Sequence, residues 1–593
     1  MTKNIRNVAI IAHVDHGKTT LVDQLFKQSG LFRENQHVEE RLMDSMDLEK
    51  ERGITIQAKN GAFNYNGTHI NIIDTPGHAD FGGEVERVLK MADGALFLVD
   101  AQEGPMPQSY FVLKKAIAQN IPLIVVINKI DKPSSRPDWV LDQVFDLMVH
   151  LEAPDEMLDF PVIYASAKNG WASNELGEEA NSMKDLYELM IDKLPQPAFS
   201  NEDPLQLLVS TISYSQFLGR SAIGKLTGGQ LKINQPIGIS TGVDSDVRTG
   251  RISKIHLFKG NDFEEVNEAG AGEIIAISGI QDITVGETVV DPENPKPLPM
   301  TAIDPPTISV EFLPNDSPFA GKEGEFVTTR QLRDRLFRET LSDIALQVSD
   351  SDTGIGYKVS GRGELHISIL IEKMRREGYE FQVSRPKVIF KDIDGANHEP
   401  YETVTITVDE SLGGKVIESM AERKGQMTDM VQDGPQIQYQ FKTPTRGLLG
   451  YQSLFMKLTK GLGTMYSTFE SYQPFSGEIR SRQRGVLVSK ETCETVSYAL
   501  SNLQERAELF LGPGIPVYKG QVVGLNSRED DMVVNVAKSK KLTNHRAAGS
   551  DDNVLLTPPT DMSLEECLSF INDDELIEIT PKTIRLRKRE FRF

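Results

Sequence analysis

Short apolar runs alternate with helical patterns over the first third of the chain. The runs are typical of buried strands and lie at 8–11, 70–73, 95–99, 123–127 and 162–165. The helical patterns between them include 84–92, 108–118 and 138–151. This alternation predicts a mainly parallel sheet that is covered by helices on both faces. Ligands of such open sheets bind at the carboxyl ends of the strands, so side chains at those ends are candidates for chemistry.

The pattern changes after the first domain, which we place at residues 1–198. Residues 203–300 carry short alternating runs rich in Val, Ile, Thr and Gly, which predict a small antiparallel β-barrel. The stretches 303–390 and 396–476 each repeat the order strand, helix, two strands, helix and strand, which predicts two ferredoxin-like α+β sandwiches. Residues 477–593 predict a mixed C-terminal domain of strand and loop. The expected fold class is therefore a multidomain α/β and β protein.

The composition is that of an ordinary folded protein, because 39% of the 593 residues are hydrophobic and 25% are charged. A chain of this length exceeds one hydrophobic core and predicts several domains. The two cysteines, Cys493 and Cys567, are too few for a disulfide framework and lack metal-site spacing, which favours a reducing cytosol. No apolar stretch approaches the roughly 20 residues that span a bilayer, and the amino terminus lacks a signal-peptide pattern, so no membrane partner is expected.

Residues 12–19, Ala-His-Val-Asp-His-Gly-Lys-Thr, join an apolar run to an amphipathic pattern. A strand, a tight loop and a helix in this order aim backbone N–H groups and a helix N-terminus at a phosphate chain. Gly17 lets the backbone approach the phosphates, Lys18 can reach the terminal phosphates, and Thr19 offers a hydroxyl to Mg²⁺. The pattern predicts a nucleoside triphosphate site with Mg²⁺ as its cofactor.

Further positions extend the predicted phosphate and metal site. Asp74 ends an apolar run, and its carboxylate can hold Mg²⁺ through water. Gly77 can present its N–H to a γ-phosphate, and the next residue, His78, can reach the attacking water. Thr55 lies in the segment Arg-Gly-Ile-Thr-Ile, and its hydroxyl can complete the Mg²⁺ shell only while a γ-phosphate is present.

A second set of strand-end residues predicts that the base is guanine. Asn128, Lys129 and Asp131 belong to the sequence Asn-Lys-Ile-Asp, which follows an apolar run. The Asp131 carboxylate can accept hydrogen bonds from the N1–H and the exocyclic amine of guanine, a donor pair that adenine lacks. Lys129 would lie along the ring, and Asn128 would brace the loop. Backbone N–H groups of Ser166-Ala167-Lys168 can meet the guanine O6, so GTP is the expected substrate.

These motifs, in this order, resemble the signature set of the translational GTPases, the family of elongation factors Tu and G. The resemblance rests on the loop at 12–19, the Arg-Gly-Ile-Thr-Ile segment and Asp-Thr-Pro-Gly-His at 74–78. It implies a P-loop GTPase domain that hydrolyses GTP to GDP and phosphate. His78 would position or polarise the water, and Asp15 would help to orient the site. No arginine finger in cis is evident, so hydrolysis by the free protein is expected to be slow and to await a partner.

The resemblance also assigns roles to individual positions of this chain. The implied catalytic residues are His78, Asp15, Lys18 and Thr55. The implied nucleotide-binding residues are Asp15, His16, Gly17, Lys18, Thr19, Thr20, Gly77, Asn128, Lys129, Asp131, Ser166, Ala167 and Lys168. The implied Mg²⁺ ligands are Thr19, Thr55 and, through water, Asp74.

Later parts of the chain resemble other domains of the same factors. The segment 219–225 resembles their second domain, 361–366 resembles the third domain of elongation factor G, and 396–476 resembles its fifth. Elongation factor G carries a further domain, which reaches the decoding site, where this chain has only residues 389–400. Direct translocation by such an arm is therefore not expected.

The segment 541–546, Lys-Leu-Thr-Asn-His-Arg, resembles a loop in the C-terminal domain of the BipA (TypA) family. With the domain order, this extends the resemblance over the whole chain and makes 477–593 a BipA-type RNA-binding domain. It implies a cytoplasmic, ribosome-associated GTPase that binds the 70S ribosome and the 50S subunit through rRNA in a GTP-gated manner. The implied role is in 50S assembly or in translation under stress or cold. A monomer is expected, with tRNA and ppGpp as further candidate ligands.

Two basic clusters contrast with the formal net charge of −22. An acidic balance argues against wrapping nucleic acid, but phosphate binding depends on local charge. The first cluster supplies the RNA-binding candidates Lys538, Lys540, Lys541, His545 and Arg546. The second crowds the terminus and contains Lys582, Arg585, Arg587, Lys588, Arg589 and Arg592. We expect each cluster to contact RNA, and a solvated charged face is the alternative.

Two other functions stay open from the sequence. A LepA-type back-translocating elongation factor also lacks the decoding arm, although the loop around His545 favours the BipA type. A nucleotide-gated RNA-binding scaffold, in which hydrolysis is incidental, is the alternative from a different class.

Overall fold

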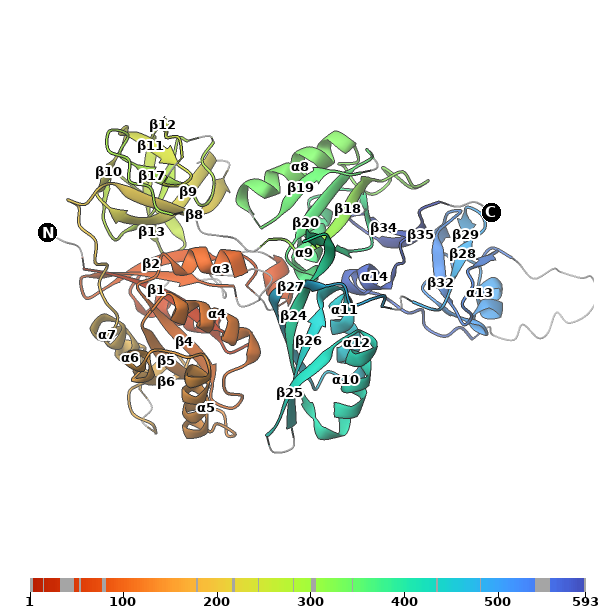
Figure 1. The fold of residues 1–593 in the computed structure, drawn as a ribbon, viewed down its shortest axis with the longest axis horizontal. Helices are drawn as coiled ribbons and strands as arrows, with labels where there is room; N and C mark the ends of the chain where they lie inside the picture. The colour runs from red at the N-terminus through yellow and green to blue at the C-terminus, as the bar shows by residue number, and fades with distance from the viewer. Residues whose placement is uncertain are drawn as a thin grey trace, which may run out of the picture. The chain divides into compact units, whose positions relative to one another are not determined.

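The computed structural model describes residues 4–590, except for internal stretches at 14, 32–46, 53–54, 77–81, 178–179, 216–218, 244, 281, 300–304, 344, 353, 434–435, 480–481 and 539–554. The chain divides into two compact units, Met1–Asp304 and Pro305–Phe593 (Figure 1). The first unit holds every strand end at which the sequence predicts nucleotide chemistry.

A mainly parallel sheet forms the core of the amino-terminal domain. Among the described residues its strand order is β2-β3-β1-β4-β5-β6-β7, with parallel pairing from β3 to β6 and antiparallel edge strands β2 and β7. The strands are β1 Asn4–Ala12, β2 Lys59–Tyr65, β3 Thr68–Asp74, β4 Gly94–Asp100, β5 Leu123–Asn128, β6 Val162–Ser166 and β7 Trp171–Ser173. Every residue of β4 and β5 is buried. Because successive side chains point to opposite faces, both faces of the sheet are covered.

Helices α1 and α7, which are Lys18–Gln28 and Lys184–Lys193, share one hydrophobic core with this sheet. Leu21 and Leu25 of α1 are fully buried there, as are Leu186 and Met190 of α7. The other helices are α2 Asp47–Arg52, α3 Gly82–Leu89, α4 Pro107–Ala118, α5 Pro137–His150 and α6 Asp155–Leu158. Since α1 directly follows the loop after β1, its N-terminus lies at the carboxyl end of that strand.

The second domain of this unit is antiparallel throughout. Eight described strands pair in the order β12-β11-β17-β8-β9-β16-β13-β14, and β10 pairs with β15. The strands are β8 Gln206–Ser215, β9 Gly219–Gly228, β10 Gln230–Lys232, β11 Pro236–Ser240, β12 Arg248–Arg251, β13 Lys254–Lys259, β14 Asp262–Val266, β15 Glu268–Gly270, β16 Ile274–Ser278 and β17 Thr288–Val290. This is the strand-rich domain predicted for residues 203–300.

Buried polar contacts join the two domains of the first unit. Lys225 of β9 forms an ion pair with Asp93, and Asn7 of β1 donates to the same carboxylate across 2.7 Å. Arg87 of α3 donates to the backbone carbonyl of Ser210 on β8 at 3.3 Å. Helix α3 follows the segment that begins at Asp74, so this contact links the expected γ-phosphate region to the β-domain.

The first sandwich of the second unit shows the predicted element order. Strand β18 is followed by α8, β19, β20, α9 and β21, and the elements are β18 Ile308–Pro314, α8 Thr329–Ser342, β19 Gln347–Asp350, β20 Tyr357–Gly361, α9 Glu364–Arg376, β21 Phe381–Ser384 and β22 Lys387–Val388. Two strands from the predicted C-terminal domain instead extend this sheet, β34 Glu575–Ile579 and β35 Ile584–Lys588. Strand β34 pairs antiparallel with β21, so the sheet order is β19-β20-β18-β21-β34-β35.

The second sandwich is a separate antiparallel sheet, in the order β23-β24-β26-β25 with β27 also paired to β24. Its elements are β23 Lys391–Ile393, β24 Ala396–Asp409, α10 Glu410–Glu422, β25 Gln426–Asp433, β26 Gln436–Pro444, α11 Thr445–Leu448, α12 Tyr451–Leu458 and β27 Thr464–Pro474. The buried residues Val404, Val416 and Phe455 show that strands and helices share one core.

The remaining C-terminal elements form a small sheet in the order β30-β32-β28-β33 and a pair β29-β31. They are β28 Val486–Ser489, β29 Cys493–Glu494, α13 Ser497–Gln504, β30 Ala507–Leu509, β31 Pro516–Val517, β32 Val522–Asn526, β33 Met532–Val534 and α14 Leu564–Phe570. Val488, Leu568 and Ile577 lie in the same core cluster as Phe312 and Phe381 of the first sandwich. The end of the chain and the first sandwich therefore form one packed body. Across the described residues, no helix is long and apolar enough to cross a membrane.

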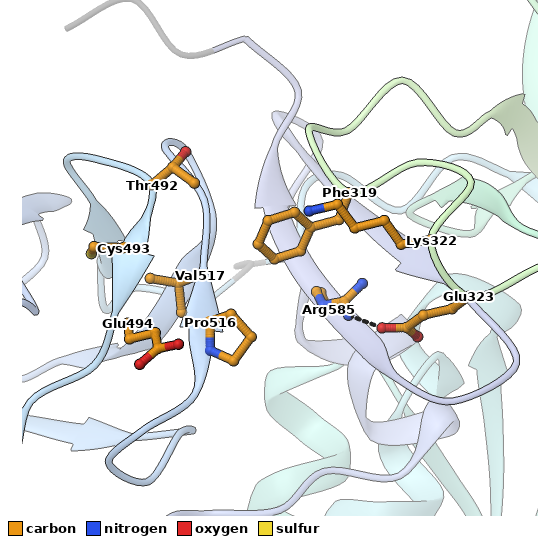
Figure 2. Close-up of a pocket in the computed structure, with 9 residues that line it drawn as sticks. All are labelled: Phe319, Lys322, Glu323, Thr492, Cys493, Glu494, Pro516, Val517 and Arg585. Carbon is orange, nitrogen blue, oxygen red and sulfur yellow. Dashed lines mark hydrogen bonds and ion pairs between the residues drawn. The ribbon is translucent and has the colours of Figure 1, made fainter.

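A cavity of about 320 Å³ lies between the first sandwich and the small C-terminal strands. Figure 2 shows Phe319 and Lys322 on one wall and Pro516 and Val517 on the other. The Lys322 ammonium lies 4.1 Å from the centre of the Phe319 ring, and Arg585 forms an ion pair with Glu323 at the base of the same wall.

Candidate guanine-nucleotide site

The predicted phosphate loop lies between the end of β1 and the start of α1. Gly17 is the N-cap of α1 and has a φ of 95°, a left-handed conformation that favours glycine. A Cβ at Gly17 would lie 2.5 Å from Nδ2 of Asn128, so only bare backbone fits. Helix α1 has no acidic residue in its first turn, and its N-terminus therefore favours an anion. This turn has the shape and polarity that a phosphate chain requires.

Lys18 brings together the three segments to which the sequence assigns phosphate and metal binding. Its ammonium lies 2.6 Å from the Thr55 hydroxyl and 2.8 Å from Oδ1 of Asp74, and it donates to the carbonyl of Thr75 at 2.9 Å. Thr55 and Asp74 are both buried, and Thr19 lies one residue beyond Lys18 in α1. Hydroxyl and carboxylate oxygens are the ligands that Mg²⁺ prefers, so this donor set fits that ion.

The segment after Thr55 is held by two acidic side chains that the sequence analysis did not single out. Glu49 of α2 accepts hydrogen bonds from the backbone N–H groups of Ile56 and Gln57, at 3.0 and 3.3 Å. Glu84 of α3 accepts from the N–H of Ala58 at 2.9 Å. No local motif marks either glutamate, because each acts on a distant part of the backbone.

The base-reading residues also meet at strand ends. Asn128, at the end of β5, donates to the carbonyl of His16 at 2.8 Å and accepts from the N–H of Ala167 at 3.0 Å. The Ser166 hydroxyl donates to Oδ1 of Asp131 at 2.7 Å. The structure thus brings the phosphate loop, the Asn128–Asp131 segment and the loop after β6 to one place. Of the other predicted nucleotide contacts, Asp15, Thr20 and Lys168 are exposed.

Asp100 is a further polar residue of this site, and sequence reasoning missed it. Its buried carboxylate lies 2.8 Å from the ammonium of Lys129 and 3.1 Å from that of Lys132. Burial alone would raise the pKa of this carboxyl, but hydrogen bonds from Lys129, the Gln102 N–H and Lys132 lower it to about 2. Lys129 has a φ of 63° and also donates to the carbonyl of Asp15. The sequence does mark this residue, because Asp100 ends an apolar run, as Asp74 and Asn128 also do.

Two histidines of the loop, His13 and His16, lie beside each other, with ring centres 5.1 Å apart. His16 is fully buried, and its Nδ1 lies 3.3 Å from the carbonyl oxygen of Leu98. Burial and the neighbouring His16 lower the pKa of His13 to about 4, so its ring is neutral at pH 7. The Nε2 of His16 lies 3.6 Å from a carboxylate oxygen of Glu103, and this neighbour lowers the pKa of Glu103. Gly77 and His78 lie outside the described residues.

The two predicted RNA-binding clusters have different outcomes. Lys538 is exposed, whereas Lys540, Lys541, His545 and Arg546 lie outside the part of the chain that the structure describes. Four residues of the terminal cluster form ion pairs within the fold, and their contact with RNA stays a prediction. The pairs are Arg585 with Glu323 and Glu578, Arg587 with Asp316, Lys588 with Asp531, Asp574 and Glu575, and Arg589 with Glu311. Their charges stabilise the junction with the first sandwich.

Four successive parts of this chain match known domain families. They are the elongation factor Tu GTP binding domain over residues 3–196, elongation factor Tu domain 2 over 219–290, the elongation factor G C-terminus over 397–483 and the TypA/BipA C-terminal domain over 484–592. Together with the fold and the site, these matches define a GTPase of the translation-factor class. The multidomain α/β and β architecture predicted from the sequence is confirmed.

Full-length relatives narrow the class to one family. The chain is 51% identical to a large ribosomal subunit assembly factor BipA of Salmonella typhimurium over 593 residues, which are 99% of this chain and 97% of that protein. It is 50% identical to the factor of the same name from Bacillus subtilis, over 99% of this chain and 96% of the relative. The chain belongs to the BipA family, as its resemblance predicted. A solved structure of a Thermus thermophilus protein shares the fold with a TM-score of 0.57 and 18% identity, over 80% of this chain and 98% of that one.

Proposed function

We propose that this chain is a ribosome-dependent GTPase, which hydrolyses GTP to GDP and phosphate and acts in assembly of the large ribosomal subunit. The observation that carries the proposal is the convergence of Lys18, Thr55 and Asp74 at the phosphate loop. Full-length relatives at 50% identity and above are named large ribosomal subunit assembly factors, which supports the ribosomal part. A role under stress or cold, a cytoplasmic location and a monomeric state belong to the same proposal.

The proposed chemistry follows from the residues at the site. Lys18 binds the terminal phosphates, and its charge offsets the negative charge that spreads over their oxygens during transfer. Thr19, Thr55 and, through water, Asp74 would hold Mg²⁺, which when bound would supply positive charge that neutralises further phosphate charge. Gly77 would donate its N–H to the γ-phosphate, and His78 would position the attacking water.

Recognition of guanine uses the opposite side of the site. Asp131 accepts from the N1–H and the exocyclic amine of the base, once its contact with Ser166 is exchanged for the nucleotide. Asn128 holds the phosphate loop and the loop after β6 in fixed positions relative to each other, and Lys129 lies along the guanine ring. The same pocket would admit ppGpp, because that ligand shares the base and the first two phosphates.

The gating is proposed to start at Thr55. A γ-phosphate that replaces the present 2.6 Å contact between Lys18 and Thr55 would reposition the backbone segment held by Glu49 and Glu84. Glu84 lies on α3, and α3 is bonded to the β-domain through Arg87. Binding or loss of the γ-phosphate can therefore change the position of the β-domain. The GTP-bound and GDP-bound forms would then differ in a way that a ribosome can recognise.

The proposed partners are the 70S ribosome, the 50S subunit and their rRNA, with tRNA as a further candidate. The match of residues 484–592 to the TypA/BipA C-terminal domain favours this interpretation over a LepA-type factor.

Multiple-turnover GTP hydrolysis, measured with and without purified 70S ribosomes, tests the proposal. We expect ribosomes to raise turnover by at least tenfold, since the chain lacks an evident arginine finger. Equal rates with and without ribosomes would contradict the proposal that GTP hydrolysis depends on the ribosome. His78→Ala should lose most of the stimulated turnover and keep its GTP affinity, and unchanged stimulation would exclude the assigned role of His78.

A further inference from the structure

Two residues of the nucleotide site have a left-handed backbone, although neither is glycine. Asp15 of the phosphate loop has a φ of 64°, and Lys129, directly after β5, has a φ of 63°. This conformation is unfavourable for a residue that carries a Cβ, and such residues keep it only where their surroundings impose it. The two residues also contact each other, because the Lys129 ammonium donates a hydrogen bond to the carbonyl of Asp15. The contact joins the base-reading segment to the phosphate loop at two strained positions.

A buried carboxylate, that of Asp100, holds the same ammonium from the other side. Asp100 ends β4, and its Oδ2 lies 2.8 Å from Nζ of Lys129. The ammonium of Lys132 lies 3.1 Å from the same oxygen, and the N–H of Gln102 donates to Oδ1 at 2.7 Å. Lys129 is therefore held between the carboxylate of Asp100 and the carbonyl of Asp15, which belong to the ends of different strands.

The turn that carries Asp100 is itself fixed on several sides. The N–H of Ala101 donates to the carbonyl of Asn128 at 2.7 Å, and the N–H of Gly104 closes the turn on the carbonyl of Asp100 at 3.0 Å. A Cβ at Gly104 would lie 2.9 Å from the ring of Trp139, so helix α5 packs directly against the turn. The fold therefore gives the Asp100 carboxylate a fixed place.

Asp100 can act on a nucleotide only through Lys129. The Asp100 side chain has no exposed surface, whereas that of Lys129 is 26% exposed. Lys129 is the residue expected to lie along the guanine ring. A lysine loses more rotamer freedom when it is ordered than most other side chains do. An anchor that already orders the Lys129 ammonium therefore lowers the entropy cost of packing its methylene chain on the base.

We propose that Asp100 is a positioning residue for guanine nucleotides, which holds Lys129 against the carbonyl of Asp15 and so places the base-binding surface and the phosphate loop together. The proposal rests on the proposed function, because it takes this site to bind GTP. It deepens that function by adding a residue that sets the nucleotide affinity from beneath the site. Lys132 shares the carboxylate and is assigned no part in nucleotide binding.

The test is a double-mutant cycle in the full chain. Asp100→Asn removes the charge of the carboxylate and keeps nearly its shape. Lys129→Met removes the ammonium and keeps an unbranched apolar side chain for the ring. GTP and GDP are titrated calorimetrically, with Mg²⁺ at pH 7, into the wild type, the two single variants and the double variant. Lys132→Gln is the matched control, because it removes the other ammonium that shares the carboxylate.

We expect Asp100→Asn to bind GTP and GDP about tenfold more weakly, by the same factor for both, because hydrogen bonds between ionised groups are among the stronger ones. In the Lys129→Met background the same substitution should change either affinity by less than about twofold, since the ammonium through which Asp100 acts is gone. Lys132→Gln should bind both nucleotides as the wild type does.

Three outcomes would overturn the proposal. A tenfold loss that persists in the Lys129→Met background would show that Asp100 acts through another part of the fold. An equal loss in Lys132→Gln would show that the charge balance at the carboxylate, and not the anchoring of Lys129, sets the affinity. If Asp100→Asn binds GTP as tightly as the wild type does, the inference fails and the proposed function stands. If the wild-type chain binds no GTP, both fail.

A second measurement separates Asp100 from the residue that reads the base. Inosine triphosphate lacks the exocyclic amine of guanine, so the ratio of the GTP affinity to the ITP affinity reports on the contact assigned to Asp131. Asp100→Asn should weaken both nucleotides and leave this ratio unchanged, because Lys129 meets the face of the ring and not the amine. A lower ratio would transfer the effect to Asp131 and contradict the role of Lys129.

The substitution lies at a buried position, so each variant is first shown by thermal unfolding to be folded at the temperature of the titrations. If Asp100→Asn does not fold, Asp100→Ser takes its place in the cycle, because Ser is smaller and still polar. The expected losses and the outcomes that contradict the proposal are the same for this variant.

Discussion

The side-chain amide of Asn128 donates a hydrogen bond to the backbone carbonyl of His16 across 2.8 Å. The same buried side chain accepts from the N–H of Ala167. One residue at the end of β5 therefore braces both the phosphate loop and the loop that is expected to meet the base. Since Gly17 leaves no space beside it, this brace sets the width of the nucleotide site.

Replacing Asn128 by Ala should weaken GTP binding by about 10- to 100-fold. The change removes two hydrogen bonds of a buried side chain and leaves their backbone partners unsatisfied, at a cost of about 1–3 kcal/mol. Calorimetric titration of GTP with Mg²⁺ measures the effect. Asn174→Ala is the matched control, because Asn174 is exposed and should bind GTP as the wild type does. Unchanged affinity in Asn128→Ala would show that the loops hold their places without the brace.

Asp131→Asn should change the preferred base from guanine to xanthine. The amide of Asn can donate to the xanthine carbonyl that stands where guanine has its amine, so the preference for GTP over XTP should fall by a factor on the order of 10³. Separate titrations with GTP and XTP measure this ratio. Loss of binding to both nucleotides would contradict the role of Asp131 in reading the base.

Acidification should destabilise the nucleotide domain through Asp100. The pKa of its carboxyl is about 2 in the fold against 3.8 as a reference, so the unfolded state binds more protons between these values. The contribution to stability is therefore complete above about pH 5 and is lost as the pH falls through 3.8 towards 2. Asp100→Asn should remove about 1–2 kcal/mol of this pH-dependent stability, measured by denaturant unfolding across that range. The exposed Asp142→Asn serves as the control and should keep the wild-type slope.

The substitution Ile577→Ala should destabilise the first sandwich, although Ile577 lies far from residues 308–384 in the sequence. Ile577 is fully buried on β34 and shares a core with Phe312, Phe381 and Val383, so its truncation should cost about 2–5 kcal/mol. Limited proteolysis should then cut the sheet of residues 308–384 faster. Ile355→Ala, at a site that is 63% exposed, is the control. Equal protection in both variants would mean that β34 does not support this sheet.

The nucleotide site could be predicted closely because its parts are local in sequence. Asp74 and Asn128 end apolar strands, Lys18 begins the helix after the loop that follows β1, and parallel strands bring such ends to one edge. Asp100 obeys the same rule and was missed because no short motif surrounds it. Glu49 could not be found in this way, since its role depends on backbone N–H groups that only the fold brings near.

The sequence alone could not show which basic residues form ion pairs within the fold. Arg585 and Arg589 look like parts of a free cluster in the sequence, but their partners Glu323 and Glu311 lie more than two hundred residues earlier in the chain. Local clustering in the sequence thus does not show which basic residues form ion pairs when their acidic partners are distant in the chain.

The pairing of β34 with β21 sets an order for how this protein is made. Strand β21 ends at Ser384, and the strand that completes its edge leaves the translating ribosome roughly 190 residues later, after about 10–40 s at 5–20 residues per second. Until then one sheet edge stays open to other nascent chains. A messenger RNA truncated before the codons of β34 would therefore yield a chain whose first-sandwich sheet keeps an exposed edge and is prone to aggregate. The last residues to be synthesised cap that edge.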